Sequence, residues 1–229
     1  MEEKRQLEVL YQISRALVGK QGLDAILQQV VQMTAELIQS KICSLMLVSS
    51  DQKELSIRAT QSLSTVYREK KPIKVGQGVS GQVVMKKTPI QVLDVTKDPL
   101  YGYPEIAKQE GLKSLLSVPL MISDKAIGVL NCYTATEKVF SREEIQLVQI
   151  VANQTALVIE HTRLITEEAQ ARLALETKKS VDAAKRVLIK KRGMSEDEAH
   201  RFIQKASMER NKPQKEVAEA ILIAADLES

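Results

Sequence analysis

The chain is poor in aromatic residues: it has no tryptophan, two phenylalanines and five tyrosines. Proteins that bind RNA by stacking bases on a platform of Phe and Tyr side chains are therefore disfavoured. Cysteine and histidine are also scarce. Cys43 and Cys132 are too few for a disulfide framework or a zinc cluster. His161 and His200 lie far apart without ligand-spaced partners, so we predict no metal site and no evident cofactor.

Long apolar runs are missing as well. No stretch approaches the ~18–20 residues that a helix needs to span a bilayer. The first ten residues, MEEKRQLEVL, are acidic and then basic, and lack the apolar segment of a signal peptide. We therefore expect a cytoplasmic protein without a membrane partner. Its 229 residues allow one or two domains with a real hydrophobic core.

Positive charge is concentrated in one segment of the chain. The net charge is only +4, but residues 185–215 hold ten Lys or Arg against four Asp or Glu. Residues 216–229 hold four acidic residues and no basic one. A basic cluster of this kind is typical of a surface that binds a polyanion such as nucleic acid. A solvated helical face gives the same count, so charge alone leaves both interpretations open.

The first 140 residues combine helical and β-rich segments. Apolar periodicity predicts helices over residues 2–18 and about 23–39. Strands are predicted at 42–48, 54–60, 89–95, 114–120 and 126–134. Because strands and helices do not alternate regularly, we predict an α+β domain with a largely antiparallel sheet flanked by helices.

From Ser141 onward the pattern is helical. Ser141 and Glu144 have the spacing of a capping box, and no Gly or Pro follows until Gly193. This permits one helix of roughly 50 residues, which makes sense as a coiled-coil connector over residues 141–183. The seam that would hold a homodimer is predicted at Ile145, Val148, Ala152, Thr155 and Ile159. The alternative is an ordinary core helix, a hinge and a second helix.

The last segment predicts three short amphipathic helices, at about 181–192, 196–209 and 213–227. Ser195 and Glu198 form a second capping box. Two apolar stripes follow, Ala199, Phe202, Ile203 and Ala206 on one helix and Val217, Ala220, Ile221 and Ala224 on the next. The candidates for phosphate contact are Lys185, Arg186, Lys190, Lys191, Arg192, Arg201, Lys205, Arg210, Lys212 and Lys215. Lysines and arginines that cover a thin core would look the same.

This segment resembles the ANTAR domain, a three-helix RNA-binding module of transcription antitermination regulators. The resemblance covers 178–226, and we place the domain at 178–229. The matching positions are Ala184-Lys185, Gly193-Met194-Ser195, Glu198-Ala199, Phe202, Ser207 and Val217-Ala218. Arg186 departs from the family, where many members have Gly. The resemblance implies binding of paired hairpins in leader transcripts, which prevents transcription termination. Because Phe202 lies on an apolar stripe, we expect it in the core rather than on a stacking surface.

Residues 1–160 resemble a GAF domain, a small-molecule-sensing fold. The matching segments are VGQGVSGQVVMKKTPIQVLDVTKDPLY (75–101) and KSLLSVPLMISDKAIGVLNCYT (113–134). The resemblance implies a pocket over one face of the sheet, closed by the loops around 61–112, for an unknown small-molecule ligand. Candidate lining residues are Met46, Tyr101, Tyr103, Ser117, Asn131 and Tyr133. The alternative is that these side chains only pack the domain or cap its loops.

Several specific chemistries are disfavoured. The Asn-Lys-X-Asp-Glu pattern of cyclic-nucleotide GAF domains is missing. Gly76-Gln77-Gly78 is not followed by Lys-Ser/Thr, so a phosphate-binding P-loop is not supported. Both cysteines fall in predicted strands, where a free thiol usually acts as a small hydrophobic group. No nucleophile–base pair can be assembled, so we predict that the chain is not an enzyme.

Together the two resemblances predict a GAF–ANTAR antitermination regulator: a signal-responsive RNA-binding protein that acts as a homodimer. One alternative is a GAF-containing DNA-binding regulator with a helix-turn-helix output. That would need base-reading polar residues at the start of the last helix, where the chain has Pro213-Gln214-Lys215-Glu216. A GAF-fold enzyme is the other alternative.

Overall fold

The computed structural model describes Tyr11 and residues 22–227. Apart from Tyr11, the predicted helix over residues 2–18 lies outside the described residues. The chain divides into two compact units, Met1–Thr162 and Arg163–Ser229. Each unit has its own hydrophobic core and is described by itself below.

The first unit contains one six-stranded sheet in the order β3-β2-β1-β6-β5-β4, with antiparallel neighbours throughout. The strands are β1 (Ile42–Val48), β2 (Glu54–Thr60), β3 (Ile73–Lys74), β4 (Ile90–Val92), β5 (Leu115–Ile122) and β6 (Lys125–Tyr133). The helices of this unit are α2 (Leu23–Leu37), α3 (Thr65–Arg68), α4 (Gly78–Lys86), α5 (Pro104–Gln109) and the first part of α6 (Arg142–Arg192). The predicted α+β class and antiparallel sheet are confirmed.

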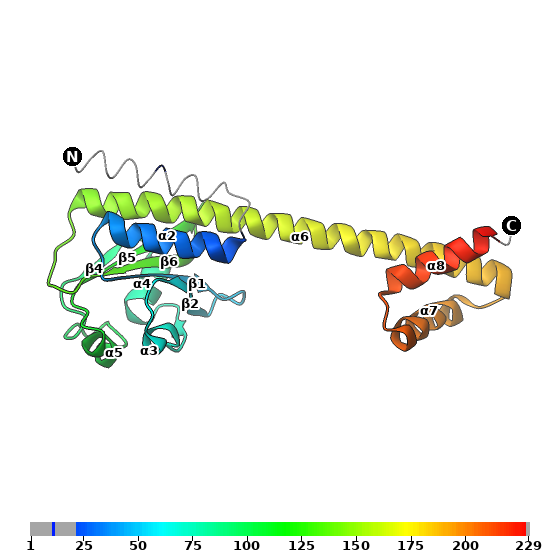
Figure 1. Cartoon of the computed structure of the whole chain (residues 1–229), viewed down its shortest axis with the longest axis horizontal. Coiled ribbons are helices and arrows are strands. Elements are labelled where there is room, and N and C mark those ends of the chain that lie inside the picture. Colours follow the sequence, from blue (N-terminus) through cyan, green and yellow to red (C-terminus); the bar gives the residue numbers. More distant parts are fainter. Residues whose placement is uncertain (1–10, 12–21, 228–229) are drawn as a thin grey trace. The chain divides into compact units, whose positions relative to one another are not determined.

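One face of the sheet is covered by α2 and the beginning of α6, as Figure 1 shows. Alternation along the strands sends Leu45 of β1 and Leu130 of β6 to this face, where both are fully buried. Cys43 and Cys132 lie directly opposite each other on the same face. Their sulfur atoms are 3.7 Å apart and both side chains are buried, so they act as small hydrophobic groups.

The predicted dimer seam on α6 is wrong. Val148, Ala152 and Ile159 are buried in the core that the helix shares with this sheet. Thr155 is also fully buried, and Ile145 packs partly against the same core. A spacing of three and four residues marks the buried face of a helix, but it does not say whether a sheet or a second helix covers that face.

The other face of the sheet carries α3, α4, α5 and their loops (Figure 1). Gly76 and Gly78 have positive φ angles of 85° and 62°, which makes the turn into α4. A Cβ atom on Gly81 would lie 2.5 Å from the carbonyl oxygen of Lys74. Glycine at this position therefore lets α4 approach β3 closely.

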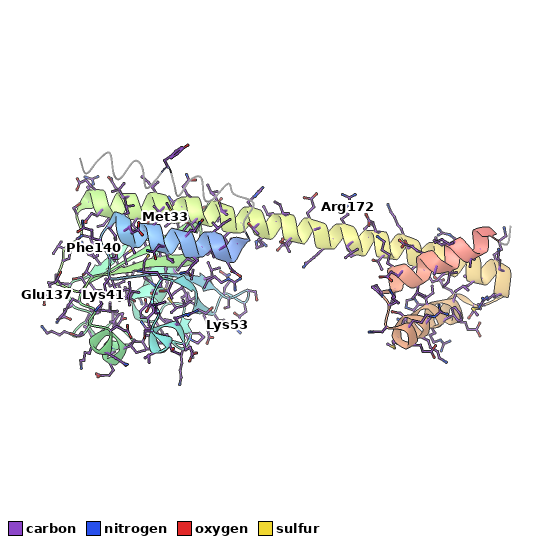
Figure 2. All side chains as sticks on the ribbon, in the orientation of Figure 1. Met33, Lys41, Lys53, Glu137, Phe140 and Arg172 are labelled. Carbon is purple, nitrogen blue, oxygen red and sulfur yellow. The ribbon has the colours of Figure 1, made fainter. Side chains whose placement is uncertain are left out.

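The long helix forms as predicted, since α6 has 51 residues. Ser141 and Glu144 exchange capping hydrogen bonds at its start, with N···O distances of 2.9 and 3.2 Å. Gly193, at φ 65°, ends it. Residues 163–175 are all exposed, and Figure 2 shows Arg172 standing out from this stretch. No helix among the described residues is long and apolar enough to cross a membrane.

The second unit packs the last turns of α6 against α7 (Glu196–Arg210) and α8 (Gln214–Leu227). The predicted capping box of Ser195 and Glu198 is present. The buried core consists of Val181, Ala184, Leu188, Ala199, Ile203, Val217 and Ala218. Two expectations fail here: Phe202 is 37% exposed, and α8 buries Ala218 while Ala220 and Ala224 are exposed.

Candidate functional site

A cavity of about 440 Å³ lies on the face of the sheet that α3, α4 and α5 cover. Its floor comes from strands β1, β2, β3 and β6, and its walls from α3, the start of α4 and the loop before α5. The lining residues are Ser44, Met46, Glu54, Ile57, Tyr67, Lys70, Pro72, Ile73, Lys74, Gln77, Gly78, Val79, Ser80, Pro99, Leu100, Tyr101, Gly102, Tyr103 and Tyr133. This volume is within the range of small-molecule sites, about 300–1,000 Å³.

Four of the chain's five tyrosines gather in this cavity. The ring of Tyr133 meets those of Tyr67 and Tyr101 edge to face, with centroids 6.0 and 6.2 Å apart. The Tyr67 hydroxyl lies 2.9 Å from Ser44 Oγ, and Tyr101 donates to Tyr133 at 3.4 Å. Burial raises the pKa of Tyr67, Tyr101 and Tyr133 well above the ordinary value, so their hydroxyls stay protonated.

Lys70 extends its ammonium group over these rings. Nζ lies 3.7 Å from the Tyr67 ring centroid, 5.6 Å from those of Tyr103 and Tyr133, and 5.9 Å from that of Tyr101. It donates to the Tyr101 hydroxyl at 3.4 Å. Among the described residues no carboxylate forms an ion pair with it. Burial lowers the pKa of Lys70 to about 7, and only the more distant charge of Glu110 opposes this.

The start of α4 contributes backbone donors to the cavity wall. Its first three amides, from Gly78, Val79 and Ser80, have no acceptor within the part of the chain that the structure describes, and Gln77 provides no side-chain cap. All four residues line the cavity. Free amides at a helix start favour negative charge.

Four of the six predicted pocket residues line the cavity: Met46, Tyr101, Tyr103 and Tyr133. Ser117 and Asn131 lie on the same face of the sheet but do not line it. They pair across β5 and β6, fully buried, and Asn131 accepts a hydrogen bond from Ser80 at 3.2 Å. They therefore lie one layer behind the wall.

The prediction missed Tyr67 and Lys70. The segment YREKKPIK (67–74) has the pattern of a solvated basic loop, because four of its eight residues are Lys or Arg. Only the fold shows that one of these lysines turns inward. Tyr67 was accessible to sequence reasoning, since a lone aromatic in a polar loop of so tyrosine-poor a chain is a candidate for packing or binding.

The predicted basic surface of the second unit is divided by ion pairs. Within the part of the chain that the structure describes, several of these residues form ion pairs with carboxylates: Lys185 with Asp182 and Glu196, Lys205 with Glu209, Lys212 with Glu216, and Lys215 with Glu176. Lys185 is the least available, because its side chain is only 16% exposed and both carboxylates lie at 3.0 Å. These two ion pairs raise the pKa of Lys185, so it stays charged as a structural group.

A groove of about 430 Å³ in the second unit gathers three of the other basic residues: Lys191, Arg192 and Arg210. Phe202 also lines it, with the Arg192 guanidinium carbon 5.4 Å from its ring centroid. The remaining lining is apolar and comes from α6, α7 and α8: Val187, Leu188, Ala206, Val217, Ala220, Ile221, Ala224 and Ala225.

Arg186, Lys190 and Arg201 are exposed but do not line this groove. Lys185 lies in a separate depression with His200 and Gln214. The sequence therefore names these basic residues but does not show how the fold groups them, and their contact with RNA stays a prediction. Within residues 22–227 no cluster of three or more His, Cys, Asp or Glu side chains could hold a metal ion.

Comparison with known proteins places the first unit in a large group of similar folds. The Nif-specific regulatory protein of Herbaspirillum seropedicae is 27% identical over 171 residues, which cover 72% of this chain but only 31% of that protein. The chain thus spans less than a third of that relative's length.

Two solved structures illustrate the fold. The GAF domain of a phosphoenolpyruvate-protein phosphotransferase from Coxiella burnetii has 25% sequence identity and a TM-score of 0.65, covering 72% of this chain and 98% of that one. The free methionine-R-sulfoxide reductase of Neisseria meningitidis has 24% identity and a TM-score of 0.60, covering 70% and 91%. Likeness at the latter level shows the fold alone.

Two family models match the sequence itself. The GAF domain model matches residues 22–159, and the ANTAR domain model matches residues 169–222. Since the GAF match covers more than half of the 229 residues, the chain belongs to the GAF domain family, and the ANTAR domain that follows gives it the organisation of a GAF–ANTAR regulator.

Proposed function

We propose that this chain is a non-enzymatic, signal-responsive regulator whose ANTAR domain binds paired hairpins in leader transcripts and prevents transcription termination. The groove around Phe202 carries the proposal. Arg192 and Arg210 can contact phosphates, and the half-exposed Phe202 ring offers a surface for one unstacked base. Arg186, Lys190 and Arg201 add positive charge outside the groove, where they would attract RNA.

Chemistry at the GAF cavity is disfavoured by its lining. The lining holds neither cysteine nor histidine, and both cysteines of the chain are buried on the opposite face of the sheet. Tyr67, Tyr101 and Tyr133 are kept protonated by burial, so they do not act as bases near neutral pH. A sensor that binds its ligand unchanged fits these residues better than a catalyst.

We propose a homodimer whose contact is on the face of α6 opposite the predicted seam. Ile150, Leu157 and Leu164 recur every seven residues and are 48%, 57% and 50% exposed. A seven-residue apolar repeat is typical of a helix that pairs with a second helix. The equivalent stripe of a second copy would cover it. Two ANTAR domains could then bind two hairpins, and this bivalency raises affinity.

The test measures binding of the full chain to a paired-hairpin leader RNA, a scrambled RNA and duplex DNA, each at two salt concentrations. We expect selective binding to the hairpins that weakens with salt. Arg192→Ala with Arg210→Ala should reduce affinity by ~10–100-fold and make the salt dependence shallower.

The matched control replaces Lys205 and Lys212 with alanine, which removes the same total charge from residues that are already ion-paired. We expect a much smaller loss in this control. An equal loss in both double variants would show that net charge, not the groove, drives binding. Tighter binding to duplex DNA than to hairpins would favour the DNA-binding alternative.

A further inference from the structure

The GAF cavity contains a positive charge that its own lining does not neutralise. Lys70 Nζ lies against the Tyr67 ring without a carboxylate partner among the described residues. Of the other lining residues that the structure describes, only Lys74 and Glu54 are charged, and these two face each other across the β2–β3 pair. Lys74 and Glu54 offset each other, so Lys70 leaves the cavity with a surplus positive charge.

The backbone N–H groups at the start of α4 favour negative charge, as Lys70 does. Gly78, Val79 and Ser80 line the cavity together with Lys70, and their amides have no acceptor among the described residues. Much of the remaining lining is apolar: four tyrosine rings with Met46, Ile57, Val79, Pro99 and Leu100. A ligand that satisfies all of these groups has a negative end and an apolar body.

A cage of tyrosine rings can also bind an organic cation. Here the cage already holds the Lys70 amine, which lies within 5.9 Å of all four ring centroids and is a cation below its pKa of about 7. A second positive charge in about 440 Å³ would be repelled. The lining therefore discriminates by charge.

We propose that the GAF cavity binds a small organic anion: a carboxylate joined to an aromatic or branched apolar group, held by Lys70 and the amides at the start of α4. The carboxylate accepts hydrogen bonds from Lys70 Nζ, and the apolar body packs against the tyrosine rings. This inference rests on the proposed sensor function and names the chemical class of its signal.

Binding of such an anion should be accompanied by proton uptake above neutral pH. Lys70 in the free protein has a pKa of about 7, and a bound carboxylate raises it. The groups around it that carry or could carry charge are Tyr67, Tyr101, Tyr103 and Tyr133, whose pKa values are all raised, together with Glu110, Lys74 and Glu54. Lys70 is the group among them that gains a proton when the anion binds above pH 7.

The experiment is calorimetric titration of the full chain with phenylacetate, 3-phenylpropionate and benzoate. It is carried out at pH 6, where Lys70 is charged before the ligand binds, and at pH 8 in two buffers of different ionisation enthalpy. Phenylacetamide is the neutral comparison and 2-phenylethylamine the cationic one. We expect at least one carboxylate to bind at least tenfold more tightly than phenylacetamide, with buffer-dependent heat that reports proton uptake. Inorganic phosphate tests whether charge alone suffices, and we expect it to bind more weakly than that carboxylate.

Variants assign the effect to Lys70. Lys70→Met should abolish the preference for carboxylate over amide and remove the proton uptake, and Lys70→Arg should restore the preference. The matched control is Lys71→Met, since Lys71 is exposed and does not line the cavity. It should leave binding unchanged.

The proposal is overturned if none of the three carboxylates binds, if amide or amine binds equally well, or if Lys71→Met has the same effect as Lys70→Met. These results do not depend on RNA. If the full chain binds a carboxylate but no hairpin RNA, only the proposed RNA-binding function is contradicted. If it binds hairpin RNA but none of the carboxylates, only the proposed ligand class is contradicted.

Discussion

The burial of Lys70 destabilises the ligand-free protein, but the same burial strengthens the attraction between Lys70 and a bound anion. Its position among four tyrosine rings removes water from the ammonium group, and the ring face of Tyr67 only partly replaces that water. A well-solvated lysine would not have this cost, but it would also offer less to an anion, because water would screen it.

We predict that Lys70→Met stabilises the ligand-free protein at pH 6 by up to ~5 kcal/mol, because each unit by which a pKa is lowered corresponds to ~1.4 kcal/mol. The folded-state pKa is lowered to about 7 from 10.5, so below pH 7 the fold carries the full penalty of a buried charge. Between these two values the unfolded chain binds the extra proton, and the stability of the wild-type protein rises with pH. The advantage of the variant should therefore shrink as the pH approaches 10.

Urea unfolding at several pH values measures this difference, with Lys71→Met as the control that stays close to wild type throughout. A gain in stability that is the same at pH 6 and pH 10 would mean that methionine merely packs better. A loss at pH 6 would mean that the cation–π contact outweighs desolvation.

Part of the GAF cavity could be predicted from the sequence, through the resemblance to GAF domains. Met46, Tyr101, Tyr103 and Tyr133 were found because the resemblance to GAF domains implies a pocket over one face of the sheet, closed by the loops around 61–112. Lys70 was not, because a lysine between glutamate and lysine has the pattern of a solvated residue, and its burial depends on contacts made by distant parts of the chain. Ser117 and Asn131 lie on the face of the sheet that carries the cavity, as predicted, but they are buried and do not line it.

Among the elements, long and regular ones were predictable and short ones were not. The runs at 42–48 and 54–60 match β1 and β2 because β-rich patterns of seven residues carry enough signal. The two-residue strand β3 and the four-residue helix α3 were missed, since their formation depends on tertiary contacts rather than on local pattern. The bounds of α6 were predictable because capping residues and Gly193 mark both ends.

The spacing of apolar residues on α6 did not reveal what covers each face of the helix. In the structure one face packs against the sheet and the opposite face is exposed. We predict that Leu157→Glu weakens the homodimer without unfolding the GAF domain, because Leu157 is 57% exposed on the proposed stripe. Ala152→Glu should instead unfold the domain, because Ala152 is fully buried against the sheet and a buried unpaired carboxylate costs several kcal/mol.

Sedimentation velocity gives the oligomeric state and circular dichroism the fold of each variant. The expected pair of results is a folded monomer for Leu157→Glu and a loss of structure for Ala152→Glu. A folded dimer with Leu157→Glu would place the contact elsewhere and contradict the proposed stripe.

At the scale of the whole molecule, the GAF cavity and the ANTAR groove lie in different units of one chain, and α6 runs through both units. Signal response requires a coupling free energy between the two sites, typically about 1–3 kcal/mol, which is ~5–150-fold in affinity. Coupling is reciprocal: the carboxylate must change the affinity for RNA by the same factor by which RNA changes the affinity for the carboxylate. Both factors can be measured in the full chain, and they must be equal if the two sites are coupled.

We predict that Ala171→Pro abolishes this coupling while each site keeps its own affinity. Ala171 is exposed and lies in the stretch of α6 between the last residue of the GAF core, Ile159, and the first of the ANTAR core, Val181. Proline there removes a backbone hydrogen bond and breaks or kinks the helix at a cost of ~3 kcal/mol, but it touches neither core. RNA affinity is measured with and without saturating phenylacetate, or whichever tested carboxylate binds.

Ala171→Ser is the matched control, because serine changes the side chain at the same exposed position and keeps the backbone donor. It should preserve the coupling factor of the wild-type chain. Coupling that survives the proline would mean that the signal does not travel as a rigid helical change and would favour coupling through the second copy of the dimer. If the proline also lowers RNA affinity without ligand, the helix holds the RNA-binding state in place, and the ligand acts by weakening or strengthening that hold.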